Sequence, residues 1–491
     1  MSRRVLIITY YWPPCGGSGV QRWVKFAKYL PAAGWQPVIY TPENPEYQGI
    51  DHSLEGEIPP EAEIVKRPIF EPYGLYRKLM GRGSTTDMKV LTSTEDETPG
   101  GKSWKQRLSL WLRSNLFVPD PRAGWVRPSV RFLKKYLQEH PVDVIVTTGP
   151  PQSLHLIGER LHRLLGIPWI PDFRDPWTQM YWFKRMPFLP CVERRHRRLE
   201  QRVLDNASAV LTVTPLVQEA YAARTRTPVA MITNGYDAED FAQTVQPDGF
   251  FNLVHTGLFP VDGNPHVLWK VLAEKCAADP AFAARLRIRL AGKTDRNIYA
   301  SLKAAGLDGN VVDCGYLDHR ATVREQLGAS VLLLPLRNDP DYALILPGKL
   351  FEYLAAGHPV LGIGAPDGAM ARVLADTGAG SCCAFDDEAG IRSFLDAAWN
   401  RFAAGAASAA NAAGAAHAAN DAGDAGAANA AGATHVANDA GVPSGSFAET
   451  RGYALSPEGT PAATPGVADV AQYERQALTR RLAELLESVI H

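Results

Sequence analysis

Short apolar segments alternate with amphipathic ones along most of the chain. Val5–Tyr11 is a β-branched and aromatic run typical of a strand, and a glycine-rich loop follows it. Apolar positions then recur at helical spacing, at Val20, Val24, Ala27 and Leu30. Pro37–Thr41 is the next strand-like run. This order of strand, loop, helix and strand predicts the opening of a doubly wound parallel α/β domain.

The same pattern continues along the chain and restarts near residue 250. Apolar strand-like runs occur at residues 142–148, 167–170, 210–213 and 229–232, and again at 253–256, 286–291, 311–314, 331–336 and 360–363. We therefore predict an α/β fold with two doubly wound domains facing across a cleft, at residues 1–236 and 251–402. The polar run 237–250 is the predicted linker.

Two stretches break this pattern. Residues 81–102 are polar and rich in Gly, Ser and Thr, and we expect a mobile loop there. Residues 403–465 are dominated by Ala, Gly, Asn, Ser and Pro, which predicts a disordered insertion. An apolar stripe returns in residues 466–491, as expected for a final helix.

Residues 345–364 combine a turn, a short helix and a buried strand. Pro347 and Gly348 mark the turn, and Gly357 ends the helix. The free N–H groups at the start of this helix favour a phosphate, with Glu352 nearby. A surface ion pair between Glu352 and Lys349 explains the same spacing equally well.

The segment Pro347–Gly357, Pro-Gly-Lys-Leu-Phe-Glu-Tyr-Leu-Ala-Ala-Gly, resembles the donor-site signature of the retaining family 4 glycosyltransferases, which have the GT-B fold. The resemblance implies that Glu352 holds the ribose of a nucleotide sugar. It also implies that the loop Pro347, Gly348 and Lys349 faces the diphosphate and the sugar. In such enzymes the final helix crosses back onto the N-terminal domain. Leu344 departs from the family, which often has a glutamate there.

Further glycines and lysines extend the donor side of this resemblance. Gly16 and Gly17 resemble the Gly-Gly loop of the N-terminal domain, and Gly257 follows the first strand of the second domain. Lys293 is a candidate for neutralising the diphosphate. A dinucleotide site with Glu43 is a weaker alternative because the spacing departs from G-x-G-x-x-G, and a tight turn without a ligand also stays open.

Two loops resemble an acceptor-side signature of one subgroup of the family. They are Thr-Gly-Pro-Pro followed by His155, and Asp172-Phe-Arg-Asp-Pro-Trp177. Asp175 could take a proton from an attacking hydroxyl, with His155 as a second catalytic candidate and Asp172 and Arg174 beside the acceptor. Alternatively, Asp172 and Arg174 pair to brace the loop, and His155 is a hydrogen-bonded scaffold residue.

The overall composition adds little to the choice of partner. A net charge of −1 gives no indication of nucleic-acid binding, and the six cysteines show no metal or disulfide spacing, which predicts a reducing cytoplasm. Asp339 and Asp341 read as a loop rather than a metal site, and we expect no metal and no cofactor. A basic amphipathic helix beginning at Trp104 fits an anionic membrane surface, or a core-facing position.

The predicted function is metal-independent sugar transfer, with retention, from a nucleotide sugar to a hydroxyl of a glycan or lipid-linked acceptor in cell-surface polysaccharide assembly. The expected location is the cytoplasm, with peripheral binding to the inner face of the plasma membrane as an alternative. A non-catalytic sugar-nucleotide or glycan-binding protein, or a nucleotide-sugar epimerase or hydrolase on the same fold, remains an alternative.

Overall fold

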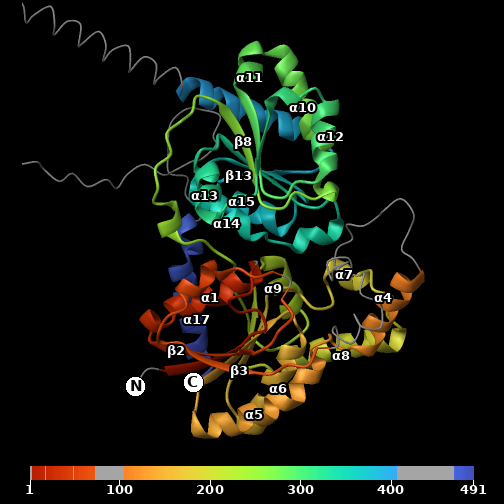
Figure 1. Cartoon of the computed structure of the whole chain (residues 1–491), viewed down its shortest axis with the longest axis vertical. Coiled ribbons are helices and arrows are strands. Elements are labelled where there is room, and N and C mark those ends of the chain that lie inside the picture. Colours follow the sequence, from red (N-terminus) through yellow and green to blue (C-terminus); the bar gives the residue numbers. More distant parts are fainter. Residues whose placement is uncertain (1–2, 17, 48, 72–103, 406–468, 491) are drawn as a thin grey trace, which may run out of the picture.

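The computed structural model of the chain describes residues 3–16, 18–47, 49–71, 104–405 and 469–490. Two α/β domains follow one another along its longest axis (Figure 1). The predicted loop 81–102 lies outside the described residues. So does the predicted insertion 403–465, apart from 403–405, which continue a helix that begins at residue 388.

The N-terminal domain contains a seven-stranded parallel sheet in the order β3-β2-β1-β4-β5-β6-β7. Its strands are β1 (Arg3–Ile8), β2 (Trp35–Pro42), β3 (Glu63–Arg67), β4 (Val144–Gly149), β5 (Trp169–Phe173), β6 (Val210–Thr212) and β7 (Val229–Met231). Its helices are α1 (Ser18–Tyr29), α4 (Trp104–Leu116), α5 (Val126–Glu139), α6 (Ser153–Leu165), α7 (Tyr181–Lys184), α8 (Pro190–Asn206) and α9 (Pro215–Ala222).

The C-terminal domain contains a six-stranded parallel sheet in the order β10-β9-β8-β11-β12-β13. Its strands are β8 (Phe251–Thr256), β9 (Leu286–Ala291), β10 (Val311–Gly315), β11 (Val331–Pro335), β12 (Val360–Ile363) and β13 (Gly380–Cys383). The helices around it are α10 (His266–Ala278), α11 (Pro280–Arg285), α12 (Arg296–Ala304), α13 (His319–Leu327), α14 (Gly348–Ala356) and α15 (Ala369–Thr377). The predicted GT-B architecture is confirmed.

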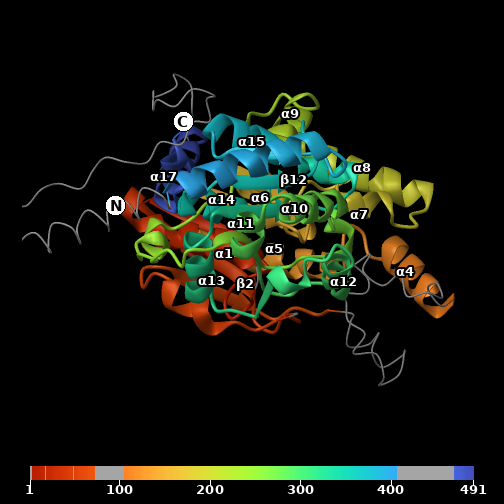
Figure 2. The same cartoon turned by 90° about the horizontal axis from the view of Figure 1, so that it is seen from above.

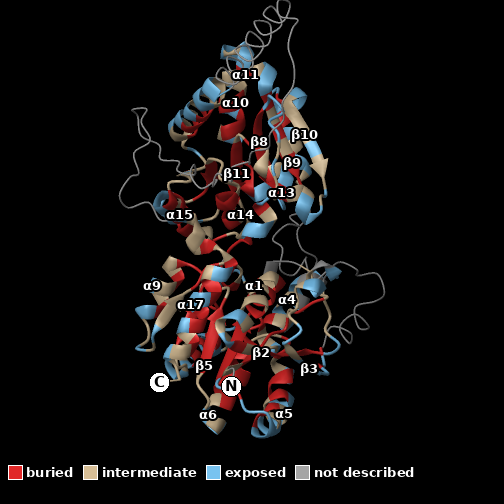
Figure 3. Cartoon of the chain, turned by 90° about the vertical axis from the view of Figure 1, so that its left-hand side faces the viewer, coloured by how far each residue is buried: buried red, intermediate tan, exposed pale blue. Residues whose placement is uncertain are grey.

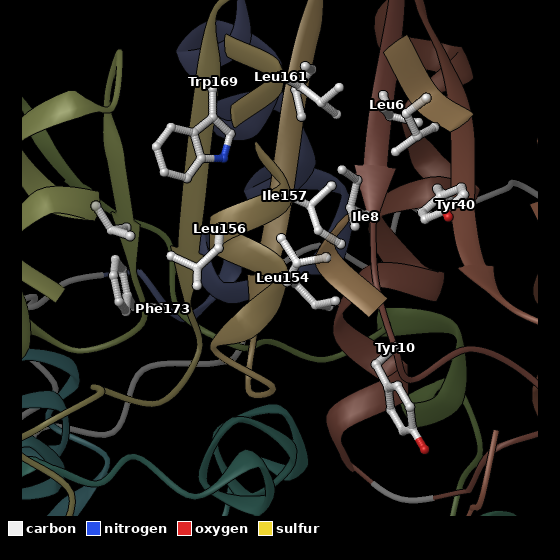
Figure 4. Packing of buried hydrophobic residues seen from close by; sticks show 14 of the residues in the cluster. Leu6, Ile8, Tyr10, Tyr40, Leu154, Leu156, Ile157, Leu161, Trp169 and Phe173 are labelled. Atoms are coloured by element: carbon white, nitrogen blue, oxygen red, sulfur yellow. The ribbon is translucent and has the colours of Figure 1, made fainter. Parts of the chain in front are cut away.

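The alternation of β1 side chains explains why helices cover both faces of the first sheet. Leu6 and Ile8 point to the face covered by α5 and α6, where they join a cluster with Ile157 (Figure 4). Val5 and Ile7 point to the opposite face, which α1 covers. Strands buried on both faces read as continuous apolar runs, as this one does. The central strands of both sheets are buried, whereas edge strands such as β10 are partly exposed (Figure 3).

The last helix, α17 (Arg475–Ser488), lies in the N-terminal domain beside α1 (Figure 2). Leu478, Leu482 and Leu486 are buried in the same cluster as Val24 of α1. Just before the helix, the ring of Tyr473 lies 5.2 Å from that of Phe351 in α14. The returning segment therefore contacts both domains.

Two further features bear on the sequence predictions. The hydrophobic pattern missed β3 and α5, whose apolar positions are mixed with charged residues. Among the described helices, none is long and apolar enough to cross a membrane.

Replacing Leu482 by Ala should lower the free energy of unfolding by about 2–5 kcal/mol, because the substitution leaves a cavity between α17 and α1. Urea denaturation measures this loss. Glu484→Ala, at an exposed position of the same helix, is the control and should change stability by less than about 0.5 kcal/mol. Equal, small effects of both substitutions would show that α17 does not pack on α1.

Candidate functional site

A cavity of about 440 Å³ lies between the two domains. The N-terminal domain, the linker and α17 line one side of it, and α13, α14 and the loop after β10 line the other. A larger groove of about 740 Å³ lies mainly between α10 and α12. We take the cavity between the domains as the candidate site, because ligands of open parallel sheets bind beyond the carboxyl ends of the strands.

Helix α14 presents its N-terminus without a side-chain cap. Pro347 is the N-cap residue, its side chain accepts no capping hydrogen bond, and a Cβ added to Gly348 would meet open space. Gly357 ends the helix in the left-handed conformation, with a φ of 73°. Free N–H groups at such a start are available to an anion, as the sequence predicted for this segment.

Glu352 lines the cavity and is held from behind by Gln326. The Gln326 side chain is completely buried and donates from Nε2 to Glu352 Oε2 at 2.9 Å and to Thr256 Oγ1 at 3.1 Å. Because its donor end faces the carboxylate, Gln326 fixes Glu352 without neutralising it. The alternative ion pair between Glu352 and Lys349 is absent among the described contacts. Sequence reasoning missed Gln326, since no pattern links it to residue 352.

Lys349 lies over the glycine that ends the first strand of the C-terminal domain. Its Nζ donates to Leu258 O at 3.4 Å and would lie 3.1 Å from a Cβ at Gly257. Gly257 has a φ of 93°, and a Cβ at Gly292 would approach Gly257 O to 2.4 Å, so both positions require glycine. Burial lowers the pKa of Lys349 to about 8. The side chain of Lys293 is exposed.

The glycine-rich loop of the N-terminal domain is described only in part. Gly16 N donates to Gly49 O at 3.0 Å, so this residue packs against a neighbouring loop. Gly17 lies outside the described residues. The predicted contact of this pair with a donor therefore stays a prediction.

The predicted acceptor contact of Asp172 is wrong. Asp172 is completely buried and pairs with the equally buried Arg22, with 3.1 Å between Arg22 Nη2 and Asp172 Oδ1. Trp23 Nε1 and Thr148 Oγ1 also donate to its carboxylate, at 2.7 and 3.0 Å. These bonds join α1, β4 and β5, so Asp172 braces the edge of the sheet. Its partner is Arg22 rather than Arg174.

Arg174 braces the loops that surround the cleft. Its guanidinium donates to Gly19 O at 2.7 Å and to Pro150 O at 3.5 Å, and it would lie 2.7 Å from a Cβ at Gly19. The neighbouring Asp175 is half-buried. Burial raises the pKa of its carboxyl, and the Arg174 guanidinium opposes this shift. Arg174 and Asp175 are thus both half-buried, whereas Asp172 is sealed from solvent.

His155 is sealed from solvent, which contradicts its predicted role as a catalyst. Its ring is completely buried, and Nδ1 lies 2.8 Å from Thr147 Oγ1. Trp169 Nε1 donates to the same hydroxyl at 3.0 Å, so Thr147 links the His155 ring to β5. Burial lowers the pKa of His155 to about 3, and it stays neutral. His155 therefore fits the alternative interpretation, in which it is a hydrogen-bonded scaffold residue.

Asp339 and Asp341 form ion pairs across the cleft. Lys184 and Arg185, at the end of α7, bind Asp341 and Asp339 respectively. These carboxylates are thus engaged by cations of the other domain. Among the described residues, no group of His, Cys, Asp or Glu has the arrangement of a metal site.

Comparison with known proteins finds one family model that matches the N-terminal part of the chain. Residues 17–235 match the model of the glycosyl transferase 4-like domain. No curated protein matches the chain. Solved structures with a similar overall arrangement include sucrose-phosphate synthase from Thermosynechococcus elongatus, at 15% identity and a TM-score of 0.49, covering 82% of this chain and 90% of that one.

Two others lie in the same range of similarity. A trehalose 6-phosphate synthase from Burkholderia multivorans has 13% identity and a TM-score of 0.48, covering 81% of this chain and 89% of the other. A glycosyltransferase from Rickettsia africae has 11% identity and a TM-score of 0.48, covering 81% and 88%. At these identities and TM-scores the likeness leaves the substrate open.

Asp172→Asn should lower the free energy of unfolding by about 3–5 kcal/mol, because it leaves the buried Arg22 charge without compensation. Chemical denaturation measures the loss, and adding Arg22→Met should recover part of it. Glu61→Gln, the same change at an exposed carboxylate, is the control. If Asp172→Asn were as mild as Glu61→Gln, the ion pair would not brace the sheet.

Proposed function

We propose that this chain, which carries a glycosyl transferase 4-like domain over residues 17–235, is a GT-B glycosyltransferase that uses a nucleotide sugar. The observation that carries the proposal is the position of Glu352. Its carboxylate lines the cavity between the domains, close to the uncapped start of α14. A vicinal diol such as ribose needs hydrogen-bond acceptors, and Glu352 has acceptor capacity beyond its one bond from Gln326.

The diphosphate of the donor would lie at the start of α14. There the first turn of the helix has no side-chain cap, and the ammonium of Lys349 supplies a positive charge. As the bond between sugar and phosphate breaks, negative charge grows on the leaving diphosphate. Fixed N–H groups and a cation stabilise such charge without reorganising, which is the largest contribution to catalysis in many enzymes. We propose that this replaces a metal ion.

The acceptor would enter from the N-terminal domain, beside Asp175. A carboxyl whose pKa is raised by burial is suited to taking a proton from an attacking hydroxyl. Arg174 holds the loops on either side of it in place. We propose a hydroxyl of a glycan or of a lipid-linked glycan as the acceptor, transfer with retention, and a role in cell-surface polysaccharide assembly on the cytoplasmic side of the membrane.

Helix α4 supports a membrane-bound acceptor, because its apolar stripe faces solvent. Large exposed side chains recur at helical spacing, at Trp104, Leu108, Trp111, Leu112 and Leu116. The buried Ser114 Oγ lies 3.5 Å from Met186 Sδ, and the half-buried Asn115 donates to Pro187 O at 3.0 Å. These bonds hold α4 beside the α7–α8 segment, at one side of the domain (Figure 1).

Basic residues lie on the same side of the domain. Helix α8 exposes Arg194, Arg195, Arg197 and Arg198, and α4 exposes Arg107. An apolar stripe flanked by arginines is typical of helices that lie on anionic membranes. The core-facing alternative for this helix is wrong, since its apolar stripe is the exposed side.

Glu352→Gln should weaken binding of a nucleoside diphosphate by about ten- to a hundredfold, because one charge-assisted hydrogen bond is worth about 1.5–3 kcal/mol. Calorimetric titration with UDP, GDP and ADP measures the loss against the unmodified protein. Glu325→Gln, on α13 and engaged with Arg289, is a control outside the cavity. Equal affinities of the Glu352→Gln variant and the unmodified protein would remove Glu352 from the site.

The full chain should co-sediment with vesicles that contain phosphatidylglycerol and should be released by salt, because each arginine near such a surface contributes about 1 kcal/mol. Trp111→Glu with Leu112→Glu should abolish this binding. Leu164→Glu, at an exposed apolar position of α6, should leave it unchanged. Equal binding to vesicles of neutral phosphatidylcholine, or no binding to either, would contradict the membrane-surface proposal.

A further inference from the structure

Arg475, the first residue of α17, is fixed in place by the linker between the domains. Its backbone N–H donates to Tyr236 O at 2.9 Å, and Tyr236 N donates to Tyr473 O at 3.1 Å. The two segments approach so closely that a Cβ at Gly235 would lie 2.2 Å from Tyr473 O. The backbone from which the Arg475 side chain projects is therefore rigidly positioned.

The guanidinium of Arg475 lines the cavity and has a donor to spare. The residue is 6% exposed, and its side chain forms no hydrogen bond or ion pair with any residue that the structure describes. Its Nη1 is shielded from solvent and has no hydrogen-bond partner in the described part of the chain. Burial lowers the pKa of Arg475 to about 10, so the group is still charged at neutral pH. A buried charged donor without an acceptor is costly, which makes this position a candidate contact for a ligand.

Other charged groups around the cavity already have partners. Lys25 binds Asp237 and, at 2.9 Å, Glu57. His319 Nε2 lies 3.0 Å from Asp240 Oδ2, and Asp318 accepts the N–H of Ala321 at 2.7 Å as the N-cap of α13. Carboxylates outnumber cations among the residues that line the cavity, so Arg475 is a positive group in a mainly acidic wall.

Glu352 and Arg475 both keep unused hydrogen-bonding capacity in the cavity. Glu352 can accept further bonds, and Arg475 can donate them. Asp237 and Glu352 also favour the charged form of Arg475, which places both carboxylates within electrostatic range of the guanidinium. The cavity thus offers one strong acceptor from the C-terminal domain and one strong donor from the helix that packs on the N-terminal domain.

We propose that Arg475 is a nucleotide-contacting residue, which donates a hydrogen bond to an oxygen of the donor's nucleoside diphosphate while Glu352 accepts from its ribose. This inference rests on the proposed function. The oxygen belongs either to a carbonyl of the base or to a phosphate, and both accept from a guanidinium. In either case the returning C-terminal helix completes a donor site whose other contacts come from the opposite domain.

Titration calorimetry of the full chain tests this inference, with UDP and GDP as probes. Arg475→Gln should weaken the tighter of the two by about tenfold or more, as expected for the loss of a charge-assisted hydrogen bond. Arg480→Gln, at an exposed position of the same helix, is the matched control and should stay within about twofold. The melting temperature of the ligand-free Arg475→Gln variant should not fall, since the substitution removes an unpartnered buried charge.

The corresponding nucleosides separate the two sources of the oxygen. A loss that also appears with uridine or guanosine assigns the contact to the base, and a loss confined to the diphosphates assigns it to a phosphate. If Arg475→Gln fails to fold, Arg475→Lys decides, and it should still weaken binding because an ammonium cannot reproduce the guanidinium geometry.

Unchanged affinity of a folded Arg475 variant, beside clear binding by the unmodified chain, would overturn the inference and leave the proposed function intact. Absence of binding of any nucleoside diphosphate by the unmodified chain would overturn both.

Discussion

The short parallel bridge between Tyr236 and Glu474 joins the two segments that run between the domains. One segment carries the chain from β7 into the C-terminal domain, and the other brings it back to α17. Because these segments are hydrogen-bonded to each other, the relation of the two sheets depends on a contact that neither domain contains alone. The candidate site lies against this bridge, with Tyr236 and Arg475 in its wall. The shape of the site therefore depends on the position of the segment that leads from the C-terminal domain back to α17.

Buried charges serve different purposes on the two sides of the cleft. In the N-terminal domain, Asp172 is satisfied by Arg22, Trp23 and Thr148, and its role is to hold strands and helix together. In the C-terminal domain, Gln326 holds Glu352 with an uncharged amide, so the carboxylate keeps its charge and its free lone pairs. Residue type alone does not distinguish these two acids. Their partners do.

The sequence predicted local features well where backbone chemistry dictates them. The strand Val360–Ile363 and the end of α14 at Gly357 agree with the structure, because a left-handed glycine followed by proline cannot continue a helix. The two parallel sheets followed from repeated apolar runs. The sequence analysis did not predict β3, because Glu63, Lys66 and Arg67 interrupt the apolar pattern at this edge of the sheet. It also missed α5, in which basic residues stand between the apolar positions.

The site residues divide in the same way. Residues within one segment, such as Pro347, Lys349 and Glu352, were selected because the segment resembles a family signature. Contacts between distant segments could not be found in this way: Arg22 and Asp172 are 150 residues apart, and Gln326 precedes Glu352 by 26. His155 and Asp172 looked accessible in loop signatures, yet both face the interior, because orientation across a sheet edge is decided by packing. Sequence reasoning also missed Arg475, because it follows the whole second domain in the sequence and reaches the cavity only in the folded chain.

Amide hydrogen exchange of the full chain, with and without a saturating nucleoside diphosphate, tests most directly whether the cleft is the donor site. The account predicts slower exchange at the start of α14, in the loop between β10 and α13, and at the start of α17, which belong to three separate parts of the sequence. The groove between α10 and α12 should not change. Protection confined to that groove, or a bound nucleotide that leaves residues 348–352 unaffected, would contradict the account.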